Sequence, residues 1–158
     1  METSVMEDIY GKIANIVSEM IPEEWDKVYL YAQVSEGVQS FYFHYYPQGQ
    51  KNTVYSPDIV DIFDVDEDSM DMLTLDLCNC CKELWEEFKN SKQDLWTNLT
   101  FILESTGEFK IDYDYTELSE IDDYERQIIW EYNNLRIEPP ADRKRDVKIL
   151  QDYLRSLK

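Results

Sequence analysis

Hydrophobic residues recur every three or four positions in four stretches of the chain, which is the spacing of one face of an α-helix. In the first stretch Ile9, Ile13 and Met20 follow this period. Pro22 then ends the helix, because proline disfavours helical backbone at the residue before it. The pattern predicts helices at about residues 3–21, 66–90, 121–135 and 142–157.

Between the predicted helices, apolar and polar residues alternate with the period of a β-strand. "VYLYAQV" (28–34) and "VQSFYFHYY" (38–46) are joined by Ser-Glu-Gly, which predicts a hairpin. "DLWTNLTFILES" (94–105) and "EFKIDYDY" (108–115) are joined by Thr-Gly and predict a second one. "TVYS" (53–56) is a candidate fifth strand, and residues 57–68 are expected to form an acidic loop.

This order of elements predicts an α+β fold. We expect an antiparallel sheet of four to five strands built from hairpins. It packs with an N-terminal helix, a long central helix and two C-terminal helices. The length of 158 residues and the lack of a linker predict a single domain over residues 1–158.

Two segments are unusually acidic: residues 104–125 hold nine acidic residues and one lysine, and residues 57–71 hold seven acidic residues and no base. Strand alternation can place Asp112 and Asp114 on a solvated face, opposite Ile111 and Tyr113. Ser119 to Asp122 resembles a helix capping box, which gives the following carboxylates a local role. Both interpretations leave the self-repulsion of the two segments unrelieved, and a basic partner would relieve it.

The overall charge narrows the choice of partner. The chain has 15 basic and 34 acidic residues, a net charge of −19, which disfavours direct binding to nucleic acid or an anionic membrane. The N-terminus lacks the basic and apolar regions of a signal peptide, and no apolar run approaches a membrane span. The three clustered cysteines at 78, 80 and 81 are a poor disulfide framework. We therefore expect reduced thiols and a cytoplasmic location.

The usual signatures of catalysis and cofactor binding are missing. Residues 64–68 begin like an EF-hand loop, but Ser69 and Leu75 stand where that motif needs glycine and glutamate. The cysteines fall within one helical turn, whereas zinc ligands form separated pairs. His44 is the only histidine, and the four glycines form no phosphate-binding loop. We expect no enzyme activity, cofactor, metal or small-molecule substrate. A carboxylate-based hydrolase stays a minor alternative, because paired acids suffice in glycosidases.

Three long stretches resemble a known family. They are "IYGKIANIVSEMIPEEWDKVYLYAQV" (9–34), "LWTNLTFILESTGEFKIDYDY" (95–115) and "YERQIIWEYNNLRI" (124–137). In these stretches the chain is similar to the YezG-like immunity proteins, which include the EsaG-type antitoxins of type VII secretion systems. The resemblance implies a cytoplasmic antitoxin that binds the nuclease domain of a secreted toxin. Arg136 stands where the family pattern has glycine, which leaves the turn geometry there open.

The family function and the charge together lead to one hypothesis: stoichiometric inhibition of a basic nuclease domain through an acidic surface. Two candidate surfaces follow. The members of the first, called the 112–123 patch, are Asp112, Asp114, Glu117, Glu120, Asp122 and Asp123. The members of the second, called the 58–68 patch, are Asp58, Asp61, Asp64, Asp66 and Asp68.

Strand alternation predicts exposed aromatic contacts at Trp96, Tyr42 and Tyr46, since Trp and Tyr dominate binding energy at interfaces. The protein would inhibit the nuclease either by blocking its active site or by binding beside that site. The alternative function is a general DNA-mimic regulator, which would bind several unrelated basic DNA-binding proteins.

Overall fold

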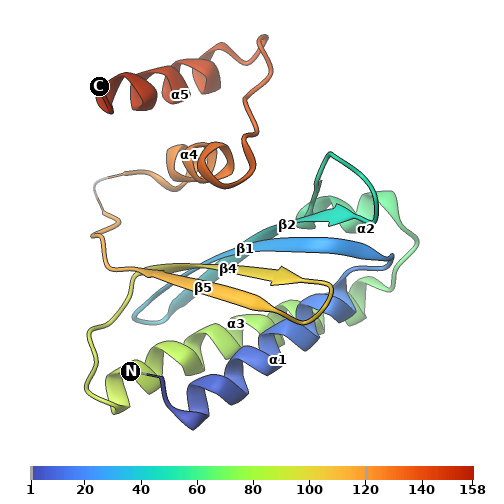
Figure 1. Cartoon of the computed structure of the whole chain (residues 1–158), viewed down its shortest axis with the longest axis vertical. Helices are drawn as coiled ribbons and strands as arrows, with labels where there is room; N and C mark the ends of the chain where they lie inside the picture. Colours follow the sequence, from blue (N-terminus) through green and yellow to red (C-terminus); the bar gives the residue numbers. More distant parts are fainter. Residues whose placement is uncertain (1, 120) are drawn as a thin grey trace. The chain divides into compact units, whose positions relative to one another are not determined.

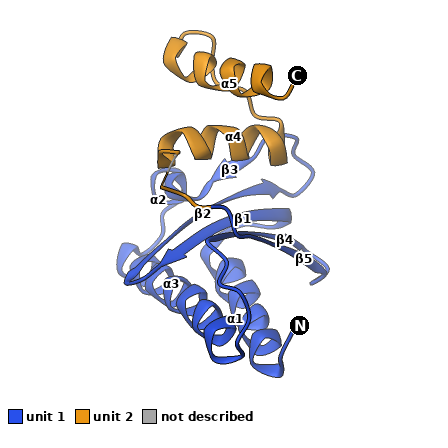
Figure 2. Cartoon of the chain, turned by 90° about the vertical axis from the view of Figure 1, so that its left-hand side faces the viewer, with its two compact units in different colours: residues 1–116 blue, residues 117–158 orange. Residues whose placement is uncertain are grey.

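The computed structural model of the chain describes residues 2–119 and 121–158. It divides into two compact units, residues 1–116 and residues 117–158, which Figure 2 colours separately. Each unit is considered by itself below. The prediction of a single domain over residues 1–158 stays a prediction.

Unit 1 is a five-stranded antiparallel sheet with two long helices against one face (Figure 1). Its strand order is β3-β2-β1-β4-β5. The helices are α1 (Ser4–Met20), α2 (Ile59–Ile62) and α3 (Glu67–Asn90), with a 3₁₀ turn, η1 (Ser56–Asp58), before α2. The strands are β1 (Trp25–Ser35), β2 (Val38–Pro47), β3 (Val54–Tyr55), β4 (Asn98–Glu104) and β5 (Phe109–Asp114). The predicted α+β fold with antiparallel hairpins is confirmed.

The core of unit 1 lies between the sheet and the helices α1 and α3. Leu30 of β1 is opposite Phe43 on one side and Phe101 on the other, and all three are buried. Ile13 of α1 and Leu84 of α3 are likewise fully buried, as their helical spacing predicts. Every buried member of this core cluster lies between residues 6 and 103.

The hairpin turns explain two of the four glycines. Gly37 in the β1–β2 turn and Gly107 in the β4–β5 turn have φ values of 76° and 96°, a region that glycine enters without steric cost. The expected acidic loop at 57–68 is only partly correct, because η1 and α2 occupy its first half. Pro57 suits the first turn of a helix, and Ile59 is fully buried and anchors α2.

Unit 2 consists of two helices, α4 (Asp123–Leu135) and α5 (Lys144–Ser156). The hydroxyl of Tyr124 donates a hydrogen bond to the buried carboxylate of Asp146, with 2.5 Å between the oxygen atoms. The guanidinium of Arg145 lies 5.0 Å from the centre of the Tyr124 ring. These contacts tie the start of α4 to the start of α5. No helix in the described ranges has both the length and the apolar character needed to cross a membrane.

Candidate interaction surface

The structure divides the 112–123 patch. Asp112 and Asp114 lie on β5 in unit 1, while Glu117, Asp122 and Asp123 belong to unit 2. Glu120 lies outside the described residues. The strand alternation is confirmed, since Asp112 and Asp114 are exposed while Ile111 and Tyr113 pack against the core. Asp112 has a long contact to Lys110, 3.6 Å from Nζ to Oδ2, which exposure makes weak.

Asp114 has a local structural role at the end of β5. Its Oδ1 accepts hydrogen bonds from the Thr116 hydroxyl at 2.6 Å and the Thr116 amide at 2.9 Å. The bond from the Thr116 hydroxyl is the main reason that the pKa of Asp114 lies below its ordinary value. This carboxylate therefore stabilises the turn that follows the strand.

The acidic residues of unit 2 also form hydrogen bonds or ion pairs with residues close to them in the chain. Asp122 is the N-cap of α4, and its Oδ1 accepts from the amides of Tyr124 and Glu125 at 2.7 and 3.1 Å. The predicted capping box at Ser119 is therefore wrong by three positions, because Asp122 itself caps the helix. Asp123 pairs with Arg126, 2.5 Å from Oδ1 to Nη1. The Ser119 amide donates to Glu117 at 3.3 Å.

The 58–68 patch lies entirely within unit 1. All five of its aspartates are exposed. Asp66 precedes α3 and accepts from the Ser69 hydroxyl at 2.6 Å. No base forms an ion pair with any of the seven acidic residues at 57–71 in the part of the chain that the structure describes. The segment follows edge strand β3, whereas β5 is the opposite edge, so Asp112 and Asp114 do not continue this surface.

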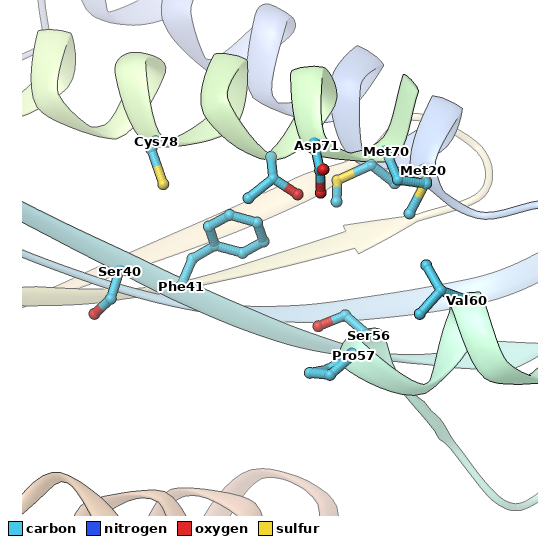
Figure 3. A pocket seen from close by; sticks show the side chains of 10 residues that line it. Met20, Ser40, Phe41, Ser56, Pro57, Val60, Met70, Asp71 and Cys78 are labelled. Carbon is cyan, nitrogen blue, oxygen red and sulfur yellow. The ribbon is translucent and has the colours of Figure 1, made fainter. Parts of the chain in front are cut away.

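An apolar groove opens beside the 58–68 patch (Figure 3). It lies between α3, β2 and the η1–α2 segment and has a volume of about 380 Å³. Six of its lining residues have apolar side chains: Met20, Phe41, Pro57, Val60, Met70 and Cys78. Asp71 and Thr74 line it from α3.

Large hydrophobic side chains are also exposed on α2 and α3, two of the elements that form this groove. Ile62 on α2 is 58% exposed, and Met72 and Leu75 on α3 are 67% and 60% exposed. Met72 and Leu75 are three positions apart, so they are neighbours on one helix face. Exposed apolar residues grouped among charged ones are typical of protein interaction sites. The groove, these three residues and the 58–68 patch together form what we call the acidic groove surface.

The overall charge also concentrates in unit 1. Residues 117–158 hold 10 of the 34 acidic and 8 of the 15 basic residues, a net charge of −2. Residues 1–116 hold the other 24 acidic and 7 basic residues, a net charge of −17. The acidic groove surface therefore lies in the unit whose field attracts cationic partners more strongly.

The prediction that Trp96 is exposed is wrong. Its side chain is 0% exposed and packs against the rings of Phe88 and Tyr113. The residue precedes β4, which starts at Asn98, so strand alternation does not apply to it. Tyr42 and Tyr46 are half-buried on β2, and Tyr42 stacks on Tyr31 with 5.0 Å between ring centres. Their predicted role as partner contacts stays a prediction.

The surroundings of the cysteines and of His44 indicate structural roles for these residues. Cys80 and Cys81 are buried in the core, and Cys78 is half-buried at the groove. Burial raises the pKa of all three thiols, which lowers their reactivity. His44 Nδ1 is hydrogen-bonded to the Thr53 hydroxyl at 3.0 Å. Within the described ranges, no group of three potential metal ligands comes together.

The sequence predicted only part of the acidic groove surface. The pattern identified its carboxylates but not the groove, since that depends on side chains from α3, β2 and η1. One signal was available: Met72 and Leu75 are apolar yet fall outside the stripe formed by Leu73, Leu77 and Leu84. Apolar residues on the outer face of an amphipathic helix indicate a second contact surface.

Comparison with known proteins identifies the family. The family model described as "Immunity protein YezG-like" matches residues 6–148. An immunity protein YezG from Bacillus spizizenii is 39% identical over 158 residues, covering 99% of this chain and 97% of that protein. Immunity protein YezG from Bacillus subtilis is 40% identical over 136 residues, covering 85% and 90%. The type VII secretion system protein EsaG from Staphylococcus aureus is 32% identical over 152 residues, covering 94% and 93%. The chain belongs to the YezG-like family of immunity proteins.

Proposed function

We propose that this protein is a cytoplasmic antitoxin that binds the nuclease domain of a secreted toxin and inhibits it stoichiometrically. The observation that carries the proposal is the acidic groove surface, where unpaired carboxylates lie beside an exposed apolar groove. Membership of an immunity protein family supports the antitoxin role. Similarity to a protein named for a type VII secretion system supports a toxin exported by such a system.

The physical reason for a nuclease as target is charge. A nuclease must hold polyanionic DNA, so the surface around its active site is basic. Unit 1, with a net charge of −17, steers toward such a surface and competes with DNA phosphates for its cations. Inhibition follows if the bound antitoxin covers the DNA path, whether it sits in the active site or beside it. This mechanism requires no cofactor and no turnover.

The test is a titration with the nuclease domain of a toxin that a type VII secretion system exports from the same organism. Fixed nuclease is mixed with increasing antitoxin, and plasmid cleavage is followed at low and moderate salt. We expect cleavage to fall linearly to zero at one antitoxin per nuclease, and to return after the complex is dissociated. Equal binding to unrelated DNA-binding proteins would instead favour a general DNA mimic. Lack of any complex, with cleavage unchanged, would overturn the proposal.

A further inference from the structure

We propose that the groove between α3, β2 and η1–α2 is the specific docking site for one apolar anchor residue of the partner, flanked there by lysine or arginine. This inference rests on the proposed function and locates the contact within it. It assigns separate tasks to the two parts of the acidic groove surface. The groove provides most of the binding energy and the surrounding carboxylates provide orientation and speed.

The groove has the properties of a side-chain pocket. Its volume of about 380 Å³ falls at the small end of ligand-binding cavities, which suits one large side chain better than an extended ligand. Phe41 forms its floor on β2, and Met20 and Met70 enter from the helices (Figure 3). Methionine side chains are flexible and polarizable, so they can adjust around an inserted aromatic or aliphatic group.

The residues around the groove determine the chemistry of the flanks. Asp71 lines the groove itself, and Asp58 and Asp61 stand next to the lining residues Pro57 and Val60 in the chain. These three carboxylates are exposed and have no ion pair within the described ranges. A cation placed beside the anchor would therefore meet Asp71 in the groove, with Asp58 and Asp61 in the segment that forms the opposite wall. An anionic or neutral segment would lack this attraction.

The same charges argue against a second copy of this chain as the occupant. Another molecule would bring its own net charge of −19 to a surface that already repels anions. Its exposed hydrophobic residues at 62, 72 and 75 are themselves accompanied by aspartates at 61, 71 and 76. Like-charge contacts across an interface oppose association and weaken binding. A cationic partner satisfies both the groove and the surrounding carboxylates, and this chain does not.

The decisive experiment fills the groove. Thr74 lines it and is itself exposed, so Thr74→Trp would occupy the groove without disturbing the core. The matched control is Thr106→Trp, the same substitution in the exposed β4–β5 turn at the other edge of the sheet. Thermal melts first establish that both variants are folded. We expect Thr74→Trp to weaken binding to the nuclease domain by about 30-fold or more, mainly through faster dissociation. Thr106→Trp should bind like the unmodified protein.

A second pair of variants separates charge from shape. Asp58→Asn, Asp61→Asn and Asp71→Asn together should slow association about tenfold and make it less sensitive to salt. The control triple, Glu86→Gln, Glu104→Gln and Glu108→Gln, changes the net charge equally at exposed positions away from the groove. If both triples slow association equally, the effect belongs to total charge, and the proposed role of the groove carboxylates is overturned.

A third measurement uses the unmodified protein. Cys78 lines the groove, whereas Cys80 and Cys81 are only 5% and 2% exposed and serve as internal references. Alkylation of each cysteine is followed by mass spectrometry at about pH 8.5, with and without bound nuclease domain. We expect Cys78 to be protected about tenfold in the complex. Unchanged Cys78 labelling, or full affinity in Thr74→Trp, would overturn the groove assignment while leaving the inhibitor function intact. If alkylation of Cys78 instead slows as the antitoxin concentration is raised without any nuclease domain, the groove binds a second copy of this chain.

Discussion

Arg136 adopts a backbone conformation that glycine reaches at lower cost. It follows α4 with φ 55° and ψ 32°, in the left-handed region where a Cβ atom is unfavourable by about 1 kcal/mol. Its guanidinium lies 5.0 Å from the centre of the Tyr132 ring, which offsets part of this strain. We predict that Arg136→Gly raises the free energy of unfolding by about 0.5–1 kcal/mol in urea titrations.

The control for this prediction is Arg136→Ala. It removes the contact with Tyr132 but keeps the Cβ atom, so it should not stabilise the protein. Equal stability of the glycine and alanine variants would show that backbone strain at this position is negligible.

Asp114 gives a prediction for pH dependence. Its pKa lies below the ordinary value of 3.8, chiefly because the Thr116 hydroxyl donates to the ionised carboxylate. The unfolded chain therefore binds the proton first as pH falls. The stabilisation is complete above the ordinary pKa and is lost as pH drops through the lower native value. We predict that Asp114→Asn lowers the melting temperature at about pH 7, and that this difference vanishes in strong acid.

The measurement is a series of paired melts of the variant and the unmodified protein between neutral and acidic pH. Asp112→Asn removes a charge from the same face of β5 without the Thr116 bonds, and so corrects for the change in net charge. A melting difference for Asp114→Asn that stays constant down to the lowest pH would contradict the prediction.

At the scale of elements, the start of α4 depends on one side chain. Asp122 accepts two amide hydrogen bonds there, and loss of such an N-cap typically costs about 1 kcal/mol. We predict that Asp122→Ala accelerates hydrogen exchange at the amides of Tyr124 and Glu125. Asp142→Ala, at an exposed position before α5, is the control and should leave those amides unchanged. Equal exchange in both variants would show that α4 does not depend on this cap.

Elements with a long hydrophobic period were predictable, and short ones were not. α1 and α3 follow from stripes such as Ile9, Ile13 and Val17, because every turn repeats the same signal. α2 has four residues and one buried anchor, Ile59, so it leaves no period to detect. The burial of Trp96 has a related cause, because this residue lies two positions before the start of β4, where strand alternation does not apply. Strand boundaries are set by pairing partners, which a local pattern does not contain.

The acidic groove surface was likewise predictable only in part. Its carboxylates were predictable, since exposed aspartates need only a hydrophilic segment. The groove was not, because Phe41, Val60 and Met70 come from three elements that only tertiary packing brings together. The members of the 112–123 patch are close in sequence but belong to two units, and all five that the structure describes have local hydrogen bonds or ion pairs.

For the whole molecule, the two units suggest that residues 1–116 fold without the rest. All five strands and every member of the core cluster lie within this range. Its length is ordinary for an independent domain. We predict that a fragment of residues 1–116 shows a cooperative thermal transition and a near-ultraviolet circular dichroism spectrum typical of packed aromatic residues. A fragment without such a transition would support a single folding domain over residues 1–158.

A folded fragment would then decide between the two acidic patches. It contains the whole groove and the 58–68 patch, but it lacks Glu117, Asp122 and Asp123. If the acidic groove surface makes the main contact, the fragment should bind the nuclease domain within about threefold of the full chain, as measured by calorimetry. A folded fragment that has lost inhibition would assign the essential contacts to residues 117–158. Since net charge falls only from −19 to −17, lost attraction could not account for that result, and direct contacts from unit 2 would be required.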